Sequence, residues 1–319
     1  MFEKKSYSKE ITLIREKSNR TNKLNSLLIQ DTVEDLNLII DGNYPQSHIN
    51  NLYSKISNPV CYFSHCHLDH TAQAYYIQEN YNGTIKCPLQ EKDYILSLEN
   101  LMEIVGFSRL GLSEAYEMLA KKYMKFQPCS EVTTFDPLTH NIDLTHYIIT
   151  TIHCPGHSPG HTAFLIKGKS KDYPNILYVS DIGSHPYYGD LNSNLPQYRK
   201  SINKLEEIYL EDDYILHPAH GTIYPTREIN FFDRIRAKIN RNGTKILAHL
   251  SKSEPKSIRE LTYEWTLRSE ERVNPIIKDL YLLWDGGMIY HHLQEFIEEG
   301  RVKKAKIDEN IMDEQYILK

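Results

Sequence analysis

The sequence of 319 residues lacks any long uncharged apolar run, and its mean hydropathy is −0.53. We therefore expect no membrane-spanning helix and no membrane partner. The five cysteines are scattered and odd in number, which predicts reduced thiols rather than a disulfide framework. The first ten residues, MFEKKSYSKE, have no apolar stretch behind their charges. From this start we expect no secretory signal peptide and a cytoplasmic location.

The chain also lacks a strong excess of either charge. Its formal net charge is −5, and residues 225–319 carry 17 Lys and Arg against 16 Asp and Glu. Proteins that bind nucleic acid through its phosphates usually present a basic surface, so the overall charge argues against that class. Hydrophobic residues make up 40% of the chain and charged residues 25%, which excludes disordered and fibrous classes. The length favours one large domain with an appendage.

Strands and helices alternate over the first two thirds of the chain, which predicts an α/β layered domain. Short apolar runs predict strands over 11–14, 25–30, 36–41, 60–64, 83–87, 147–152, 161–166, 176–180 and 214–216. Helical periodicity predicts helices over 45–56, 72–79, most of 89–128, and 196–210.

From about residue 226 the chain becomes heavily charged, poor in glycine and helical in pattern. A long helix is predicted over 227–250, and Ser257 with Glu260 three positions later is typical of a capping box at the start of the next helix. Two more helical stretches end at Gly300, and residues 301–318 are predicted to form a β-hairpin.

Three helices followed by a hairpin is the order of a winged-helix module. The alternative is a helical extension that only packs on the core, and topology inferred from one sequence leaves both open. We therefore divide the chain into a catalytic domain, 1–225, and a small winged-helix-like domain, 226–319.

Clusters of His and Asp follow four of the predicted strands directly. They are HCHLDH at 65–70, HCPGHSPGH at 153–161, Asp181, and HPAH at 217–220. Strand ends on one edge of a sheet converge in space, so we expect these side chains to meet. Imidazole and carboxylate groups are the ligands that suit Zn²⁺ and related divalent ions. The sequence therefore predicts a metal centre.

The spacing divides the candidate ligands between two ions. In an extended backbone alternate side chains face the same way, so His65 and His67 point together while Cys66 points aside. Each ion keeps a coordination place for water, as a catalytic site requires. The first ion is assigned His65, His67 and His157, the second is assigned Asp69, His70 and His220, and Asp181 bridges both.

The motifs HCHLDH, PGHSPGH, SDIG and HPAHG resemble, in order and spacing, those of the metallo-β-lactamase fold superfamily over roughly residues 8–225. The resemblance implies a four-layer αβ/βα sandwich with a dinuclear site on one edge. It also implies that His161, the second His of its motif, supports the catalytic site without being a ligand. The tail, with GMIYHHLQEFIEEGRVKK, resembles the C-terminal winged-helix domain of the lactamase-beta-like protein 2 group. That group includes a single-strand-specific endoribonuclease and many hydrolases.

The predicted activity is that of a dinuclear metal-dependent hydrolase. Two ions lower the pKa of a bridging water, giving a hydroxide that attacks a carbonyl or phosphorus centre. Asp69 is the candidate catalytic residue that orients this nucleophile or passes a proton. We expect Zn²⁺, with Mn²⁺ or Fe²⁺ as alternatives.

The substrate class stays open at this point. We prefer a small ester, thioester or lactone, with residues 89–128 and the tail forming the pocket rim. Single-stranded RNA is the alternative, for which Arg301, Lys303, Lys304 and Lys306 offer a local basic patch. Other classes are an iron-dependent oxygenase or redox protein of the same fold and a non-catalytic scaffold. A homodimer is a further expectation.

Some interpretations concern residues beside the motifs. Tyr187 and Tyr188 follow Asp181 closely, and either they reach the reacting oxygen or they form pocket wall. Asp190 is predicted to be a surface carboxylate. Cys66 and Cys154 are expected to pack in the interior rather than to bind metal.

Overall fold

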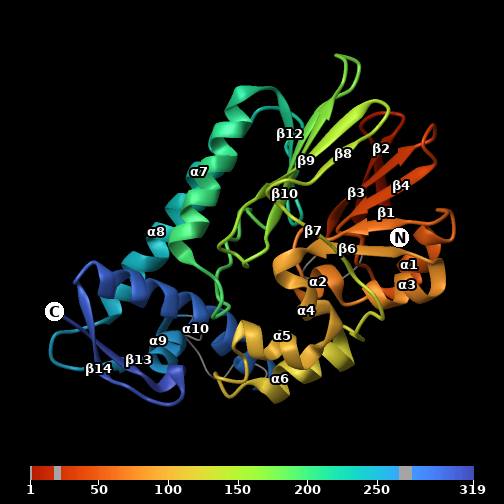
Figure 1. The fold of residues 1–319 in the computed structure, drawn as a ribbon. Helices are drawn as coiled ribbons and strands as arrows, with labels where there is room; N and C mark the ends of the chain where they lie inside the picture. The colour runs from red at the N-terminus through yellow and green to blue at the C-terminus, as the bar shows by residue number, and fades with distance from the viewer. Residues whose placement is uncertain (1, 18–22, 266–274) are drawn as a thin grey trace.

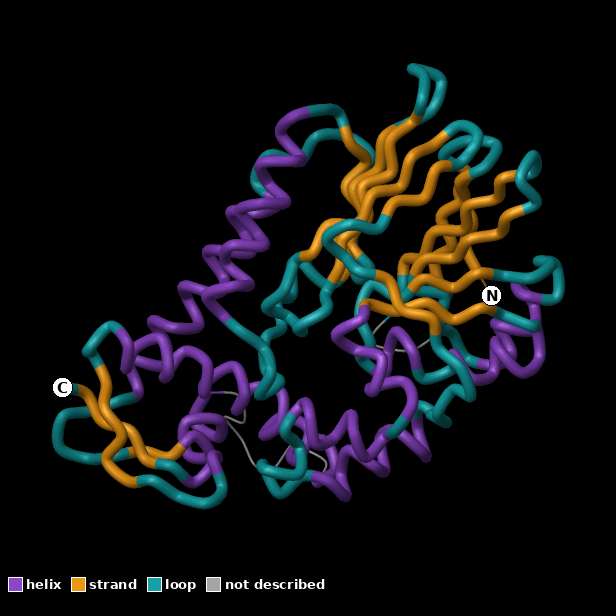
Figure 2. Tube along the Cα trace, in the orientation of Figure 1, coloured by secondary structure: helices purple, strands orange, loops and turns teal. Residues whose placement is uncertain are grey.

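The computed structural model describes residues 2–17, 23–265 and 275–319. Two β-sheets lie side by side in the larger part of the molecule, and helices cover the outer side of each (Figure 1). This is the predicted αβ/βα sandwich of four layers. Figure 2 shows a third, much smaller sheet near the C-terminus, set apart from the other two.

The first sheet has seven strands in sequential order. Its first four strands are antiparallel, and the last four are parallel and therefore need crossover connections. The strands are β1 (Phe2–Ser6), β2 (Ile11–Glu16), β3 (Asn25–Asp31), β4 (Leu36–Ile40), β5 (Val60–Tyr62), β6 (Thr84–Pro88) and β7 (Thr133–Phe135). The helices between β4 and β6 are α1 (Gln46–Tyr53), α2 (Leu68–Thr71) and α3 (Ala74–Tyr81).

The second sheet has five strands in the order β12-β11-β10-β9-β8. They are β8 (Asn141–Asp143), β9 (Tyr147–His153), β10 (Thr162–Gly168), β11 (Asn175–Ser180) and β12 (Tyr214–Pro218). Helix α7 (Leu195–Glu211) connects β11 to its parallel neighbour β12. Strands β9 and β10 pair from Thr162 opposite His153 to Gly168 opposite Tyr147, which places the loop between them at one end of the sheet.

Residues 89–128 contain several short helices rather than one long run. Ser97 ends one and caps the next, since its Oγ accepts the N–H of Asn100 at 3.2 Å. Gly106, with a φ of 91°, ends that second helix in the left-handed conformation. The segments are η1 (Leu89–Glu91), α4 (Lys92–Leu96), α5 (Leu98–Val105), α6 (Ser113–Met118) and the π-helical turn η2 (Leu119–Tyr123).

The C-terminal part contains helices α8 (Phe231–His249), α9 (Ile258–Trp265) and α10 (Pro275–Glu298) and a three-stranded sheet in the order β13-β15-β14. The strands are β13 (Lys256–Ser257), β14 (Val302–Lys306) and β15 (Gln315–Leu318), and η4 (Ile311–Asp313) precedes the last. The predicted hairpin is confirmed, because β14 and β15 pair antiparallel.

The predicted capping box at the start of α9 is also confirmed. Ser257 Oγ accepts the N–H of Glu260 at 3.1 Å, and the Glu260 carboxylate accepts the N–H of Ser257 at 2.7 Å. In the parts of the chain that the structure covers, no helix has the length and apolar character needed to cross a bilayer.

Two apolar cores hold these layers together. One lies between the sheets and continues into the tail, and it includes Ile39, Phe164 and Ile289. The other lies between the second sheet and the helices α7 and α8, and it includes Leu177 and Phe232. Helix α8 therefore belongs to residues 226–319, but its first half packs in the core beside the second sheet.

Candidate metal centre

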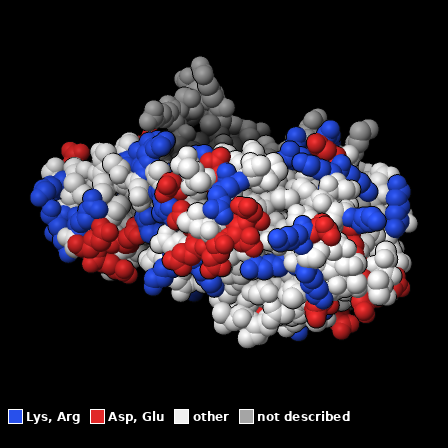
Figure 3. Space-filling view, turned by 90° about the horizontal axis from the view of Figure 1, so that it is seen from above, with Lys and Arg blue, Asp and Glu red and all other residues white. Residues whose placement is uncertain are grey.

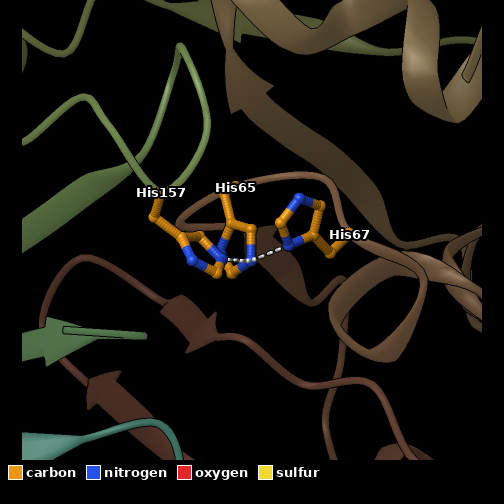
Figure 4. A group of neighbouring side chains, drawn as sticks. All are labelled: His65, His67 and His157. Atoms are coloured by element: carbon orange, nitrogen blue, oxygen red, sulfur yellow. Dashed lines mark hydrogen bonds between the residues drawn. The ribbon is translucent and has the colours of Figure 1, made fainter. Parts of the chain in front are cut away.

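Three histidines from two loops converge at the edge of the sandwich (Figure 4). His65 and His67 lie between β5 and α2, and His157 lies between β9 and β10. The Nε2 of His65 is 3.1 Å from Nδ1 of His67 and 3.2 Å from Nε2 of His157. A tetrahedral Zn²⁺ site with bonds of about 2.0–2.1 Å places its nitrogen ligands about 3.3 Å apart. The spacing of these three nitrogens fits such an ion.

The remaining candidate ligands form a second group beside the first. Asp69 and His70 lie on α2, Asp181 follows β11, and His220 follows β12. One ligand atom from each lies within 4.8 Å of those of the others. Among the described residues, buried side-chain atoms without a hydrogen bond include His70 Nε2, His220 Nε2 and Asp181 Oδ1. Three buried polar atoms of this kind, brought together from different elements, suit a cation.

Asp181 lies between the two groups. Its Oδ1 is 3.1 Å from His70 Nε2 and 3.5 Å from His220 Nε2. Its Oδ2 is 3.6 Å from His157 Nε2 and 3.9 Å from His65 Nε2. One oxygen therefore faces each group, as a bridging carboxylate would. Ser180, with a φ of 51°, adopts the left-handed conformation that turns the chain into this position.

Backbone carbonyls fix the orientation of two of the rings. His157 Nδ1 lies 2.8 Å from the carbonyl oxygen of Tyr187, and His220 Nδ1 lies 3.1 Å from that of Lys23. Each Nδ1–H donates to its carbonyl, which leaves the Nε2 lone pair facing the metal group. Such partners commonly set both the tautomer and the direction of a metal-binding histidine.

Asp41 holds His70 from behind. Its Oδ2 is 3.2 Å from His70 Nδ1 and accepts hydrogen bonds from the hydroxyls of Ser64 and Tyr178 at 2.6 and 2.7 Å. Asp41 is buried and follows the last residue of β4. The strand-end position is the same signal that identified the ligands, but the sequence interpretation gave Asp41 no role.

The prediction for Asp190 is wrong, because this residue is buried rather than on the surface. Its Oδ2 lies 2.7 Å from Nε2 of His67, and its Oδ1 accepts a hydrogen bond from the Tyr187 hydroxyl at 2.7 Å. Asp190 thus stands behind His67 as Asp41 stands behind His70. The local sequence resembles an ordinary polar turn, and only the fold reveals the contact.

Glu91 joins the two ligand loops. One of its oxygens accepts the Cys66 N–H at 2.6 Å, and the other accepts the Ser158 hydroxyl at 2.6 Å and the Gly160 N–H at 2.7 Å. The residue is fully buried. Sequence analysis did not find it, because nothing in its local pattern marks it.

His161 lies behind Asp181, and its supporting role stays a prediction. Its Nε2 accepts the backbone N–H of Asp181 at 3.2 Å, and its Nδ1 lies 3.2 Å from the carbonyl of Cys154. Burial and the neighbouring His157 hold its pKa well below the ordinary value, so the ring is neutral.

Burial and neighbouring charges shift the pKa values of these histidines in opposite directions. Burial, together with His70, holds the pKa of His65 well below its ordinary value, and burial with His67 lowers the pKa of His157 to about 4. Burial would also lower the pKa of His67, but the carboxylate of Asp190 outweighs it and raises that pKa to about 9. A cation binding at His67 must therefore displace a proton.

The tyrosines and cysteines beside the two metal groups are hydrogen-bonded or buried within the protein. The Tyr188 hydroxyl lies 2.8 Å from His292 Nε2 on α10, and the Tyr187 hydroxyl is bonded to Asp190. These contacts favour a wall role for both tyrosines. All five cysteines are free and buried, and neither Cys66 nor Cys154 belongs to the two metal groups.

Comparison with known proteins agrees with this geometry. No profile of a known protein family matches the chain. A probable metallo-hydrolase of Methanocaldococcus jannaschii is 30% identical over 168 residues, which cover 50% of this chain and 68% of that protein. The chain belongs to the metallo-β-lactamase superfamily.

Other members of the superfamily extend the comparison. The hydroxyacylglutathione hydrolase GloC of Haemophilus influenzae is 26% identical over 201 residues, 62% of this chain and 85% of that protein. A β-lactamase domain protein of Burkholderia ambifaria superposes with a TM-score of 0.71 at 15% identity, covering 99% of this chain and 93% of the other. A metallo-β-lactamase family protein of Thermus thermophilus gives 0.70 at 13% identity, covering 98% and 100%.

At such identities the structural likeness shows the fold, and it extends over the C-terminal part as well. The sequence relatives and the two His and Asp groups together support a metal-dependent hydrolase.

Proposed function

We propose that this superfamily member hydrolyses a small ester, thioester or lactone with two divalent metal ions, most simply Zn²⁺. The observation that carries the proposal is Asp181, whose two oxygens face two separate groups of ligands. When bound, the ions supply a water acidic enough to act as a nucleophile near neutral pH.

The protein's own residues would have distinct parts in this reaction. The three-histidine group and the Asp69 group would hold the ions, and Asp181 would offer one oxygen to each group. Asp69 Oδ2 lies 3.3 Å from Nε2 of His220 at the rim of the second group. Burial would raise the pKa of Asp69, but His70 and His220 outweigh it and hold that pKa well below its ordinary value, so the group is a carboxylate. In this state Asp69 can orient the attacking water and receive its proton.

A thioester is the first substrate to test, because a relative of similar sequence is named as a hydroxyacylglutathione hydrolase. The charges of the tail speak against RNA. Of the four residues in the candidate basic patch, Arg301 pairs with Glu299 at 3.0 Å, Lys304 with Glu314 at 2.8 Å and Lys306 with Asp308 at 2.9 Å. Basic and acidic side chains are also interspersed over the face in Figure 3. Phosphate binding has little unpaired positive charge to use here.

We further propose that residues 226–319 form a winged-helix domain whose last helix is used inside the molecule. The order α8, β13, α9, α10 and a hairpin, with all three strands in one sheet, supports this assignment. On α10, Leu282, Met288, Ile289, Leu293 and Phe296 are buried. A helix packed in this way presents little surface to a nucleic-acid groove. The side chain of Trp265 lies outside the described residues.

The test compares metal-stripped protein with protein reloaded with Zn²⁺, Mn²⁺ or Fe²⁺ on thioester, lactone, β-lactam and labelled RNA substrates. We expect zinc-dependent hydrolysis of the thioester or lactone, two ions per chain, and no turnover by His67→Ala. Cleavage of RNA alone would assign the endoribonuclease activity instead. One iron per chain with oxygen consumption and no hydrolysis would assign the oxygenase class.

A further inference from the structure

The loop of residues 187–190 supports two of the three histidines in the first metal group, and we call it the Asp190 loop. The carbonyl oxygen of Tyr187 accepts the His157 Nδ1–H at 2.8 Å, and the carboxylate of Asp190 lies 2.7 Å from His67 Nε2. The loop itself runs between β11 and α7 and has no regular structure. Its position therefore depends on what packs behind it.

The C-terminal helix α10 packs behind the Asp190 loop. His291 Nε2 lies 2.6 Å from the carbonyl oxygen of Asp190, and His292 Nε2 lies 2.8 Å from the Tyr188 hydroxyl. His291 is 8% exposed, so its hydrogen bond to the loop is shielded from water. A residue 101 positions further along the chain thus contacts the backbone of the residue that orients His67.

At Gly189 and Gly287 the backbones of the Asp190 loop and of α10 contact each other directly. A Cβ at Gly287 of α10 would lie 1.6 Å from the carbonyl oxygen of Gly189, and a Cβ at Gly189 would lie 2.4 Å from the carbonyl oxygen of Trp284. Neither position accepts a side chain without separating the helix from the loop. A Cβ at the adjacent Gly286 would lie 2.7 Å from the flexible end of the Met312 side chain and 3.3 Å from Thr262 Oγ1, and neither atom belongs to the backbone.

The second metal group is held differently. Asp41 supports His70, and the carbonyl of Lys23 supports His220, both from the first sheet side of the molecule. The contacts of α10 with the Asp190 loop therefore concern the three-histidine group.

We infer that His291 is a positioning residue for the first metal ion, and that the C-terminal domain is an integral part of this ion's site. Through the carbonyl of Asp190, His291 fixes the carboxylate that orients His67, and α10 as a whole fixes the loop that orients His157. The inference rests on the proposed two-ion function. It adds that affinity for one of the two ions is set by a helix of the other domain.

The experiment measures Co²⁺ or Zn²⁺ affinity in a His220→Ala background, in which only the three-histidine group is complete. We expect His291→Leu to weaken binding by up to about 10-fold, less than the roughly 10- to 100-fold effect of losing a direct partner of a metal ligand, because His291 acts on His67 through Asp190. His291→Gln should restore most of the affinity, because its amide can donate to the same carbonyl. The control is Leu293→Ala, a buried residue of α10 that belongs to the core between the sheets and the tail, whereas Tyr188 of the loop belongs to the other core.

Two results would overturn the inference: unchanged affinity in His291→Leu, or equal losses in His291→Leu and Leu293→Ala. If His291→Leu does not fold, Gly287→Ala and Gly286→Ala provide the same comparison in the same background. Both replace a helical glycine by alanine, and only the former should lose affinity for the ion. A parent protein that binds no ion at all would instead refute the proposed function.

Discussion

Glu91 accepts the backbone N–H of Cys66 with one carboxylate oxygen and the N–H of Gly160 with the other. These two donors belong to the two loops that carry the three-histidine group. A single buried carboxylate therefore links the loop of His67, which follows a strand of the first sheet, to the loop of His157, which follows a strand of the second. The same interaction makes the metal centre sensitive to a residue that binds no metal.

Replacing Glu91 by Gln tests this relationship. The amide oxygen can keep the bonds to Ser158 and Gly160, but the NH₂ group then faces the Cys66 N–H, leaving a buried donor without an acceptor. We expect a loss of about 1–3 kcal/mol in the free energy of unfolding and weaker zinc binding. Denaturant unfolding and zinc titration measure both. Glu99→Gln, exposed on α5, is the control and should change neither.

Replacing Asp190 by Asn tests the support of His67. The neutral amide holds the ring less strongly than the carboxylate, so we expect zinc affinity at the three-histidine group to fall about 10- to 100-fold. Isothermal titration measures the effect. Asp172→Asn, an exposed carboxylate, should leave the affinity unchanged. Wild-type affinity in Asp190→Asn would show that the 2.7 Å contact with His67 has no role in metal binding.

Replacing Asp181 by Asn tests the bridge. The amide can occupy the same place but has no negative charge to hold two cations together. We expect the metal content to fall from two ions toward one, and turnover to fall by more than about a hundred-fold. Mass spectrometry of the metal content decides the case, since equal content in variant and parent contradicts a bridging role.

Stripping the metal should lower the melting temperature without changing the secondary structure. At a free ion concentration of 100 times the dissociation constant, each bound ion adds about 2.7 kcal/mol to the free energy of unfolding. For a chain of this size we therefore expect a decrease of roughly 5–15 °C. Thermal melts with and without a chelator, repeated after zinc is restored, check this. An unchanged melting temperature in the presence of the chelator would contradict the proposed binding of ions between the two sheets.

Removing residues 226–319 should lower stability and small-substrate turnover together. The cut exposes the second core, to which Phe231, Phe232, Ile235 and Ile239 of α8 belong, and it removes α10 from the Asp190 loop. A rise in KM accompanied by a lower melting temperature is the expected result. A folded, truncated protein with unchanged kinetics would show that the tail has no part in the site.

The sequence alone could predict that these His and Asp side chains meet, because their signal is local. His65 and His67 stand two positions apart after a buried strand, and Asp181 and His220 each follow a strand of their own. Strand prediction places such residues at one sheet edge without any knowledge of side-chain packing. The nine predicted strands are all present, because their apolar runs are bounded by polar turns.

The elements that sequence analysis missed depend on tertiary contacts. Strand β1, with the sequence FEKKS, is almost entirely exposed and exists through pairing with β2, so no apolar pattern marks it. Glu91 and Asp190 are single acidic residues in polar segments, and their burial follows from how distant loops meet. The break-up of residues 89–128 is set partly by Gly106, where Leu191 fills the space that a side chain would need.

Residues that follow strands of both sheets form the two metal groups, so the candidate ligands become available at different times during synthesis. His65, His67, Asp69 and His70 belong to the first half of the sandwich, whereas His157, Asp181 and His220 belong to the second. During synthesis, six of these seven side chains leave the ribosome before the last of them, His220. His291 follows about 70 residues later, after several more seconds of elongation at about 5–20 residues per second. The three-histidine group is therefore completely synthesised before the second group, which stays incomplete until His220.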